Sequence, residues 1–365
     1  MSARSLNNVN IQSITLIPTP REIRQQYPQT PSTRRTVAHG RETIEKILDG
    51  EDPRLLAIVG PCSIHDVQAG LDYARRLHAL ATELQETLVI VMRVYFEKPR
   101  TVLGWKGLIN DPFMDDTFRI DEGLRIARRF LLQLAELGLP AATEALEPHT
   151  PQYIGDLISW TAIGARTSES QTHREMASGL STPVGFKNSM DGSIASAVNA
   201  VKSARQPHHF LGITELGRPA VFGTTGNPYP HVILRGGPRP NYDAEHIQIC
   251  EAMLREAGLP VRIMVDCSHG NSAKDPARQA EVLRDILSQM ERGNRSIFGF
   301  MLESFLEEGA QPLTADPASL RYGVSITDPC LGWEATEALL REAHARYRPC
   351  LETHRVPAAR PKATR

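Results

Sequence analysis

The sequence predicts an α/β fold: a (β/α)8 TIM barrel with an N-terminal extension and an inserted β-hairpin. Short apolar runs alternate with amphipathic helical patterns, which is typical of parallel sheets built from βα units. The runs lack strict polar alternation, as strands buried on both faces should. They read LLAIVGPCSI, LVIVMRVY, LPAATEAL, WTAIGAR, PVGFKN, HVILRGG, IMVDCSH and FGFMLES. This number of runs favours a closed barrel. The alternative is a six-stranded doubly wound sheet, but no GxGxxG motif follows the first run.

Helical patterns fill the stretches between these runs. Residues 66–84 begin with Asp66, an acidic residue suited to capping a helix N-terminus. Residues 121–137 repeat apolar side chains on one helical face, at Leu124, Ala127, Leu131 and Leu134. Both stretches are therefore predicted to be helices that cover the barrel.

Three segments are expected along the chain. Residues 1–50 form an N-terminal extension packed outside the main domain, and residues 51–348 form the barrel. The stretch between Lys187 and Arg235 is too long for one helical crossover, and its sequences HHFLGI and AVFGTTG predict a hairpin at about 208–230. Residues 349–365 are rich in Pro and Arg, which predicts a disordered tail.

Composition excludes several functional classes. The formal net charge of -1 gives no field that would draw the protein to nucleic acid or to a membrane surface. No run reaches the 18 or so apolar residues of a membrane span, and the N-terminus lacks the apolar run of a signal peptide. The 5 cysteines are scattered without a CxxC pair, as in a reduced, cytoplasmic protein.

Each predicted strand ends in a residue that can bind a ligand or take part in chemistry. Because parallel strands of a barrel end at one mouth, these residues should converge there. Chains also turn polar at loops, so any single one of them is equally well explained as a loop residue. In order they are Cys62, Arg93, Glu144, Arg166, Lys187, Arg235, His269 and Glu303.

The cations among them would crowd one pocket. Arginine binds phosphate and carboxylate bidentately, and lysine supplies a point charge. Without a ligand these side chains would repel one another, so a polyanion carrying a phosphate and a carboxylate is implied. The alternative is a set of surface salt bridges. The residues are Arg93, Lys98, Arg166, Lys187 and Arg235.

A second set suits one divalent transition metal ion, such as Mn, Fe, Co or Zn. Sulfur, imidazole and carboxylate ligands form a mixed site of this kind. The set is Cys62, His269, Glu303 and the later Asp328. Its members are far apart in sequence, so no spacing motif supports it. A lone cysteine such as Cys62 is more often a packed small residue, and His269 is also explicable as a helix cap.

Several long motifs resemble 3-deoxy-D-arabino-heptulosonate 7-phosphate synthases of the microbial, feedback-regulated type I class. They are GPCSIHD, MRVYFEKPRTVLGWKGLINDP, GARTSESQTHREMASGLSTPVGFKN, ILRGG, MVDCSHGNS and SITDPC. The similarity runs from about Leu6 to Arg346. It implies a (β/α)8 barrel, usually dimeric or tetrameric, whose N-terminal extension makes regulatory and oligomer contacts. It also implies the first step of the shikimate pathway, in which phosphoenolpyruvate condenses with erythrose 4-phosphate.

The resemblance also implies roles for individual residues. The metal ligands are matched by Cys62, His269, Glu303 and Asp328. The phosphoenolpyruvate site is matched by Arg93, Lys98, Glu144, Ala165, Arg166, Lys187 and Arg235. The erythrose 4-phosphate site is matched by Lys98, Pro99, Arg100 and Thr101, with Asp328 near the aldehyde. Lys98 and His269 are candidate proton carriers, and Glu144 is a candidate for orienting water.

Feedback inhibition by an aromatic amino acid is a further implication. The matching effector positions are Asn8, Pro151, Gln152, Ser181, Phe210 and Gly212, each also explicable as loop packing. Asn8 and Gly212 resemble the tyrosine-sensitive branch, while GNPYPH and ITDPCLGWE are closer to the tryptophan-sensitive one. Tyrosine is favoured over tryptophan, and phenylalanine comes last.

The chain departs from the family pattern at two places, and two rival functions compete with the one implied by the resemblance. Ser189-Met190 stands where the family usually has Gly-Thr, and Phe113 stands where a histidine is common. One rival is a related barrel synthase that uses arabinose 5-phosphate, although KPRT and GWKGLINDP favour the four-carbon sugar. The other is a catalytically inactive aromatic-amino-acid sensor, although the presumed metal ligands and Lys98 are all present.

Overall fold

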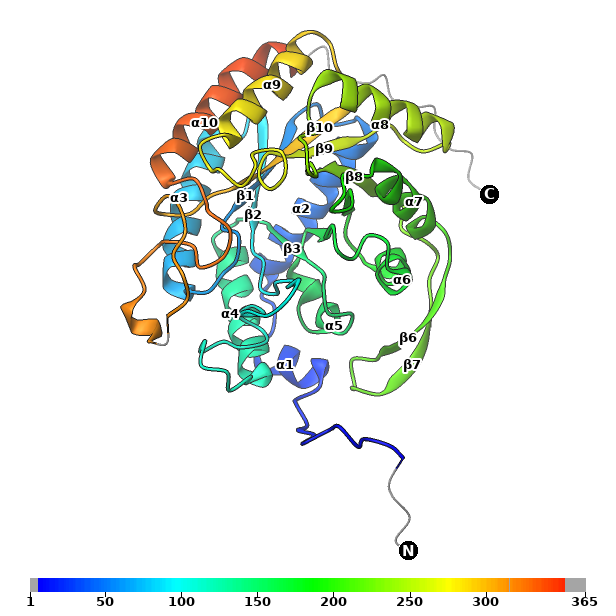
Figure 1. The fold of residues 1–365 in the computed structure, drawn as a ribbon, viewed down its shortest axis with the longest axis vertical. Coiled ribbons are helices and arrows are strands. Elements are labelled where there is room, and N and C mark those ends of the chain that lie inside the picture. Colours follow the sequence, from blue (N-terminus) through cyan, green and yellow to red (C-terminus); the bar gives the residue numbers. More distant parts are fainter. Residues whose placement is uncertain (1–5, 315, 352–365) are drawn as a thin grey trace, which may run out of the picture.

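Eight parallel strands close into a barrel, as predicted (Figure 1). The computed structural model describes residues 6–314 and 316–351. The order around the barrel is β1-β10-β9-β8-β5-β4-β3-β2. The barrel strands are β1 (Leu55–Gly60), β2 (Leu88–Arg93), β3 (Ala141–Glu144), β4 (Trp160–Ile163), β5 (Val184–Lys187), β8 (Pro230–Leu234), β9 (Ile263–Asp266) and β10 (Ile297–Glu303).

Helices surround the strands and occupy the expected stretches. Asp66 caps α3, because its Oδ1 accepts a hydrogen bond from the Ala69 amide at 3.0 Å. The helix predicted at 121–137 is α4, and its apolar face is buried. The helices of the barrel are α3 (Val67–Leu84), α4 (Ile120–Glu136), α5 (Thr150–Ile154), α6 (Gln171–Gly179), α7 (Ile194–Ala204), α8 (Ala244–Glu256), α9 (Gln279–Glu291) and α10 (Trp333–Tyr347). Three 3-10 turns accompany them: η1 (Gly155–Leu157), η2 (Pro317–Ser319) and η3 (Arg348–Cys350).

The inserted hairpin is also present. It consists of β6 (His209–Ile213) and β7 (Pro219–Gly223), which pair antiparallel between α7 and β8. Figure 1 shows it standing away from the barrel beside α6 and α7. Phe210 and Phe222 stack at 5.7 Å on one face of the hairpin, while Leu211 and Val221 are exposed on the other.

The N-terminal segment contains α1 (Pro20–Gln26) and α2 (Pro31–Asp49). Helix α2 closes the amino end of the barrel, where Ile44 and Ile47 join a buried cluster with Leu56 and Trp160. Alternate strand residues thus fill the barrel lumen, and the intervening ones face the surrounding helices. The extension is therefore part of the core at this end.

Two further expectations concern the C-terminal tail and membrane-spanning helices. Of the tail expected to be disordered, residues 352–365 lie outside the described residues, while Cys350 ends the short turn η3. Among the described helices, none is long and apolar enough to cross a membrane.

Candidate active site

A cavity of about 320 Å³ opens at the carboxyl ends of the barrel strands. All the predicted substrate residues except Arg93 line it, together with His269 and Asp328. The predicted substrate residues in its wall are Lys98, Pro99, Arg100, Thr101, Glu144, Ala165, Arg166, Lys187 and Arg235. Closure of the barrel therefore brings together residues from distant parts of the sequence, as the strand-end pattern predicts.

Four cations of this cavity lack an acidic partner among the described residues: Lys98, Arg100, Arg166 and Arg235. Among the described residues, neither Arg166 nor Arg235 forms an ion pair, although Arg166 Nε donates to Thr101 Oγ1 at 3.0 Å. Arg235 is only 6% exposed, and burial lowers the pKa of its guanidinium despite the opposing effect of Asp266. Buried positive charge without a counter-ion favours an anionic ligand at this position.

The predicted metal ligands also lie close together. One donor atom each from Cys62, Glu303 and Asp328 falls within 4.8 Å of the others. His269 lies just outside this group, with its Nε2 3.6 Å from Oε1 of Glu303. A thiol and two carboxylates around one point, with an imidazole beside them, fit a divalent transition metal ion. The donor chemistry of the site therefore agrees with the ligand set that the sequence predicts.

Cys62 is buried between the other predicted metal ligands and the predicted substrate residue Lys98. Burial raises the pKa of its thiol, Glu303 adds to this effect, and Lys98 opposes it. The Lys98 ammonium lies 3.1 Å from Cys62 Sγ. Burial acts against the charged form of Lys98, but Cys62 and the nearby carboxylates outweigh it and raise the pKa of this amine. Metal binding must therefore displace a proton from the thiol.

Glu303 is fully buried and held from both sides. Its Oε1 accepts from Arg93 Nη2 at 2.8 Å, and its Oε2 accepts from Ser268 Oγ at 2.7 Å. Burial alone would raise the pKa of Glu303, but His269 and Arg93 contribute to lowering it to about 2. The carboxylate is thus charged and fixed in place.

Arg93 behaves differently from the other predicted substrate residues. It is completely buried, its guanidinium lies 3.5 Å from the centre of the Tyr95 ring, and its Nε donates to the Pro61 carbonyl. It therefore reaches the site from beneath, through Glu303, and is not part of the cavity wall.

Sequence reasoning missed several residues at this mouth. Asp266 is fully buried at the end of β9, where its Oδ2 accepts from Lys187 Nζ at 2.8 Å. Burial would raise the pKa of Asp266, but His269 and Lys187 lower it well below its usual range. Lys274 and Met190 also line the cavity, and Lys274 pairs with Asp328 at 3.0 Å. The one available signal was the position of Asp266, at a strand end three residues before a predicted ligand.

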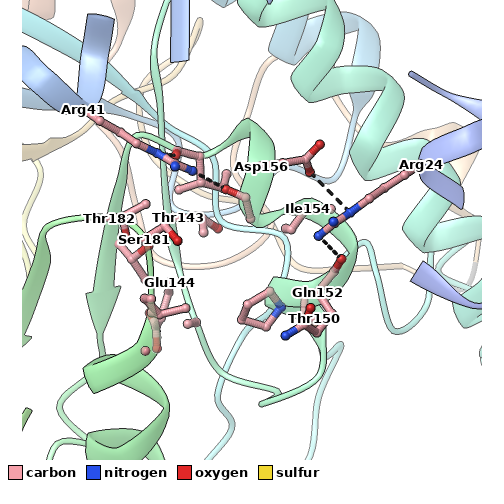
Figure 2. Close-up of a pocket in the computed structure, with 17 residues that line it drawn as sticks. Arg24, Arg41, Thr143, Glu144, Thr150, Gln152, Ile154, Asp156, Ser181 and Thr182 are labelled. Carbon is pink, nitrogen blue, oxygen red and sulfur yellow. Dashed lines mark hydrogen bonds and ion pairs between the residues drawn. The ribbon is translucent and has the colours of Figure 1, made fainter. Parts of the chain in front are cut away.

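Glu144 separates the substrate cavity from a neighbouring one of about 310 Å³. Figure 2 shows this second cavity, with Arg24 and Arg41 reaching in from α1 and α2 and Glu144 at one edge. Oε1 of Glu144 is buried and has no hydrogen-bond partner among the described residues. A Cβ atom at Gly164 would lie 2.3 Å from that oxygen, so a glycine is needed beside it.

The predicted effector residues largely converge as well. Pro151, Gln152, Ser181, Phe210 and Gly212 line a third cavity, of about 470 Å³, between the hairpin and α6. Pro151, Gln152 and Ser181 also border the cavity of Figure 2. Asn8 is not brought to this place within the chain, because it lies exposed in the N-terminal segment.

Comparisons with known proteins match nearly the whole chain. Residues 27–341 match the DAHP synthetase I family, where DAHP is 3-deoxy-D-arabino-heptulosonate 7-phosphate. Phospho-2-dehydro-3-deoxyheptonate aldolase, Tyr-sensitive, from Escherichia coli K12 is 54% identical over 344 residues, covering 94% of this chain and 97% of that protein. The Phe-sensitive aldolase of the same strain is 53% identical over 336 residues, covering 92% and 96%. The structure of the aldolase from Francisella tularensis SCHU S4 matches with a TM-score of 0.90 and 45% identity, covering 95% of this chain and 100% of that one. The chain therefore belongs to the DAHP synthetase I family.

Proposed function

We propose that this protein condenses phosphoenolpyruvate with D-erythrose 4-phosphate and water to give 3-deoxy-D-arabino-heptulosonate 7-phosphate and phosphate. The observation that carries this proposal is a cavity in which cations without an ion pair, Arg166 and Arg235 among them, lie beside the donors of a metal site. The cations suit a phosphorylated anion, and the metal donors suit a metal ion that acts as a Lewis acid. The named activity of the relatives supports the same reaction.

In the proposed reaction, carbon 3 of phosphoenolpyruvate forms a bond to the aldehyde carbon of the sugar phosphate. Water adds at carbon 2, and phosphate leaves with cleavage of its carbon–oxygen bond. When bound, a divalent ion (Mn, Fe, Co or Zn) supplies Lewis acidity to the aldehyde oxygen. Its proposed ligands are Cys62, His269, Glu303 and Asp328.

The protein groups position the reactants and move protons. Arg166, Lys187 and Arg235 are proposed to bind the phosphate of phosphoenolpyruvate, and Ala165 borders it. Arg93 and Lys98 serve the carboxylate, with Arg93 acting from beneath the cavity. The loop residues Pro99, Arg100 and Thr101 are proposed to bind erythrose 4-phosphate.

Three residues are proposed to act on the reacting atoms. The Lys98 ammonium lies beside Cys62, where it is proposed to donate a proton to the former aldehyde oxygen and so form the new hydroxyl group, with His269 as the second proton carrier. Glu144 lines the substrate cavity, and its Oε1 has no hydrogen-bond partner among the described residues, so it is proposed to orient the attacking water.

Feedback inhibition is proposed to act through the cavity beside the hairpin, with tyrosine as the favoured effector. A Cβ at Gly212 would lie 3.0 Å from the Phe222 ring, so a larger residue there would crowd the cavity in which a phenol would sit. The two relatives reported above differ by only one percentage point of identity, so identity alone does not favour one effector.

We also propose a homodimer or homotetramer in which residues 1–50 make contacts between subunits. Leu211 and Val221 are directly paired on the hairpin and are 81% and 68% exposed. The extended N-terminal segment exposes further apolar side chains at Leu6, Val9, Ile11, Ile14 and Leu16. Exposed apolar surface of this kind suits contact with a second copy, to which Asn8 would contribute. A cytoplasmic location suits the five cysteines, all of which are buried.

The test is phosphoenolpyruvate consumption by the purified protein with erythrose 4-phosphate. It is run after chelation, then with Mn added back, and then with tyrosine, tryptophan or phenylalanine. Metal-restored turnover is expected, and the amino acid that suppresses it identifies the effector. Turnover with arabinose 5-phosphate only would favour the rival synthase. No turnover with any divalent metal, but binding of an aromatic amino acid, would favour the sensor function.

A further inference from the structure

We propose that Asp266 is a positioning residue that couples the metal-binding and phosphoenolpyruvate-binding halves of the site through one carboxylate oxygen. Oδ2 of Asp266 lies 2.8 Å from Lys187 Nζ and 2.9 Å from His269 Nδ1. This proposal rests on the function proposed above, in which Lys187 binds the substrate phosphate and His269 the metal ion.

The surroundings of Asp266 hold its carboxylate in one orientation. Its side chain is fully buried at the end of β9, and its Oδ1 accepts from the Ser268 amide at 2.9 Å. The Ser268 hydroxyl in turn donates to Oε2 of Glu303. Asp266 therefore reaches the metal ligands by two routes: directly at His269, and through the Ser268 segment to Glu303.

A carboxylate at Nδ1 fixes which imidazole nitrogen is free. With the ring proton on Nδ1, facing Asp266, the lone pair of His269 lies on Nε2, on the side of Glu303. The Nδ1 contact is short but oblique, and it is not a well-aligned hydrogen bond. A carboxylate in this position raises the basicity of a ligating imidazole and holds its ring.

Because Lys187 and His269 share one oxygen of Asp266, the direction in which substrate binding changes metal affinity can be predicted. A phosphate bound to Lys187 competes with Asp266 for the protons of the ammonium group. Asp266 then keeps more negative charge for His269, which becomes a better ligand. Phosphoenolpyruvate should therefore tighten metal binding through Asp266, and by linkage the metal should tighten phosphoenolpyruvate binding by the same factor.

A purely structural role would give a different pattern. If Asp266 served only to neutralise buried Lys187, its loss would change stability and substrate binding but not metal affinity. The matched control is Asp156→Asn, which removes another carboxylate paired with a buried cation, Arg128, outside the substrate cavity. Asp266→Asn keeps the size of the side chain while removing its charge.

The experiment measures the dissociation constant of Mn²⁺ by the paramagnetic resonance of the free ion, with and without phosphoenolpyruvate. Asp266→Asn should raise that constant about 10- to 100-fold and reduce the tightening by phosphoenolpyruvate, whereas Asp156→Asn should leave both at wild-type values. Wild-type Mn²⁺ affinity in Asp266→Asn, or an unchanged effect of phosphoenolpyruvate, overturns the proposal. A changed thermal midpoint alone counts against it too.

If Asp266→Asn fails to fold, a second pair of variants tests the coupling between substrate and metal binding. Lys187→Met and Arg235→Met each remove one cation of the cavity, but only Lys187 contacts Asp266. Lys187→Met should tighten Mn²⁺ binding several-fold more than Arg235→Met does, and equal effects would overturn the coupling. Failure of the proposed function shows separately, as a wild-type protein that binds Mn²⁺ and phosphoenolpyruvate without turnover.

Discussion

The ammonium group of Lys98 lies 3.1 Å from Sγ of Cys62 and equally close to the Cys62 carbonyl oxygen. A cation from the loop after β2, which lines the substrate cavity, is therefore in contact with a buried thiol from the loop after β1. This contact places a proton source beside the proposed metal site.

Lys98→Ala should abolish turnover and leave metal bound. General acid catalysis by a positioned group contributes roughly 10²- to 10⁴-fold, so a rate loss of that order is expected. Lys106→Ala is the control, because Lys106 is exposed on the same loop and contributes only its carbonyl to Lys98. Rate assays and Mn²⁺ titration of both variants test the prediction. Near-normal rates in Lys98→Ala would remove this residue from the chemistry.

Replacement of Ser181 or Pro151 should relieve feedback inhibition with little loss of rate. Both residues line the cavity beside the hairpin, and neither lines the substrate cavity. Ser181→Phe and Pro151→Leu fill the space in which an effector would sit. Ala79→Phe adds similar bulk at an exposed position of α3 and serves as the control. Inhibition curves that match the wild type in both variants would place the effector site elsewhere.

Glu97→Gln should stabilise the protein at alkaline pH. Glu97 is 3% exposed, and burial raises its pKa to about 8, although hydrogen bonds from Thr150 and the Glu147 backbone oppose this. The folded state thus keeps a proton that the unfolded state has lost above about pH 4.5. Wild-type stability should therefore fall as the pH rises from about 4.5 to 8, by a few kcal/mol.

Urea unfolding of the wild type, Glu97→Gln and Glu147→Gln at pH 5 and pH 8.5 tests this expectation. Glu147 is a neighbouring carboxylate whose side chain is 52% exposed, so its variant should follow the wild type. A Glu97→Gln protein that gains no stability relative to wild type between the two pH values would contradict the prediction.

His231 should make the barrel sensitive to mild acid. It is buried at the start of β8, where Trp160 Nε1 donates to its Nε2 at 3.2 Å, and burial lowers its pKa to about 4. The unfolded state, with a histidine pKa near 6.5, binds a proton first as the pH falls. Stability should therefore be complete above about pH 6.5 and decrease by roughly 3 kcal/mol towards pH 4.

The free energy of unfolding, followed from pH 7.5 to pH 4.5, tests the His231 prediction. His231→Asn should be less stable at neutral pH, because it loses contacts in the core, but it should show a shallower decrease. His39→Asn, at an exposed position of α2, should keep the wild-type slope. Equal slopes for His231→Asn and the wild type would assign the acid sensitivity to other groups.

Leu211→Lys should weaken self-association without unfolding the chain. Leu211 is exposed opposite Val221 on the hairpin, so the added charge disturbs no contact within the chain but opposes burial against a second copy. Ile249→Lys is the control, at an exposed apolar position of α8. Sedimentation at micromolar concentration should show a smaller species for Leu211→Lys only, and an unchanged mass would argue for another interface.

The sequence predicted the barrel and most of the cavity wall for one physical reason. Buried parallel strands show as apolar runs, and their carboxyl ends must meet, so residues such as Glu144 and Lys187 could be placed together from the order of the runs alone. The direction in which each strand-end side chain points was not predictable in this way. Arg93 ends β2, yet packing against Tyr95 and Glu303 turns it beneath the cavity.

Residues that act through another residue were the hardest to predict. Asp266 is an acid within a buried run, and its contacts with Lys187 and His269 depend on neighbouring strands rather than on any spacing. Asn8 could be matched only by resemblance, and one chain does not bring it to the hairpin cavity. In the homo-oligomer proposed above, its partners would lie on a second subunit.

The position of α2 limits how the N-terminal segment can be separated from the enzyme. A chain that begins at residue 30 would keep Ile44 and Ile47 packed against the amino end of the barrel. A chain that begins at residue 50 would lose both side chains and expose that end to water. A deletion that tests the regulatory role proposed for this segment should end before α1, because Ile23 of α1 is itself buried in the core. A deletion that extends into α2 would remove apolar side chains that are buried against the strands of the barrel itself.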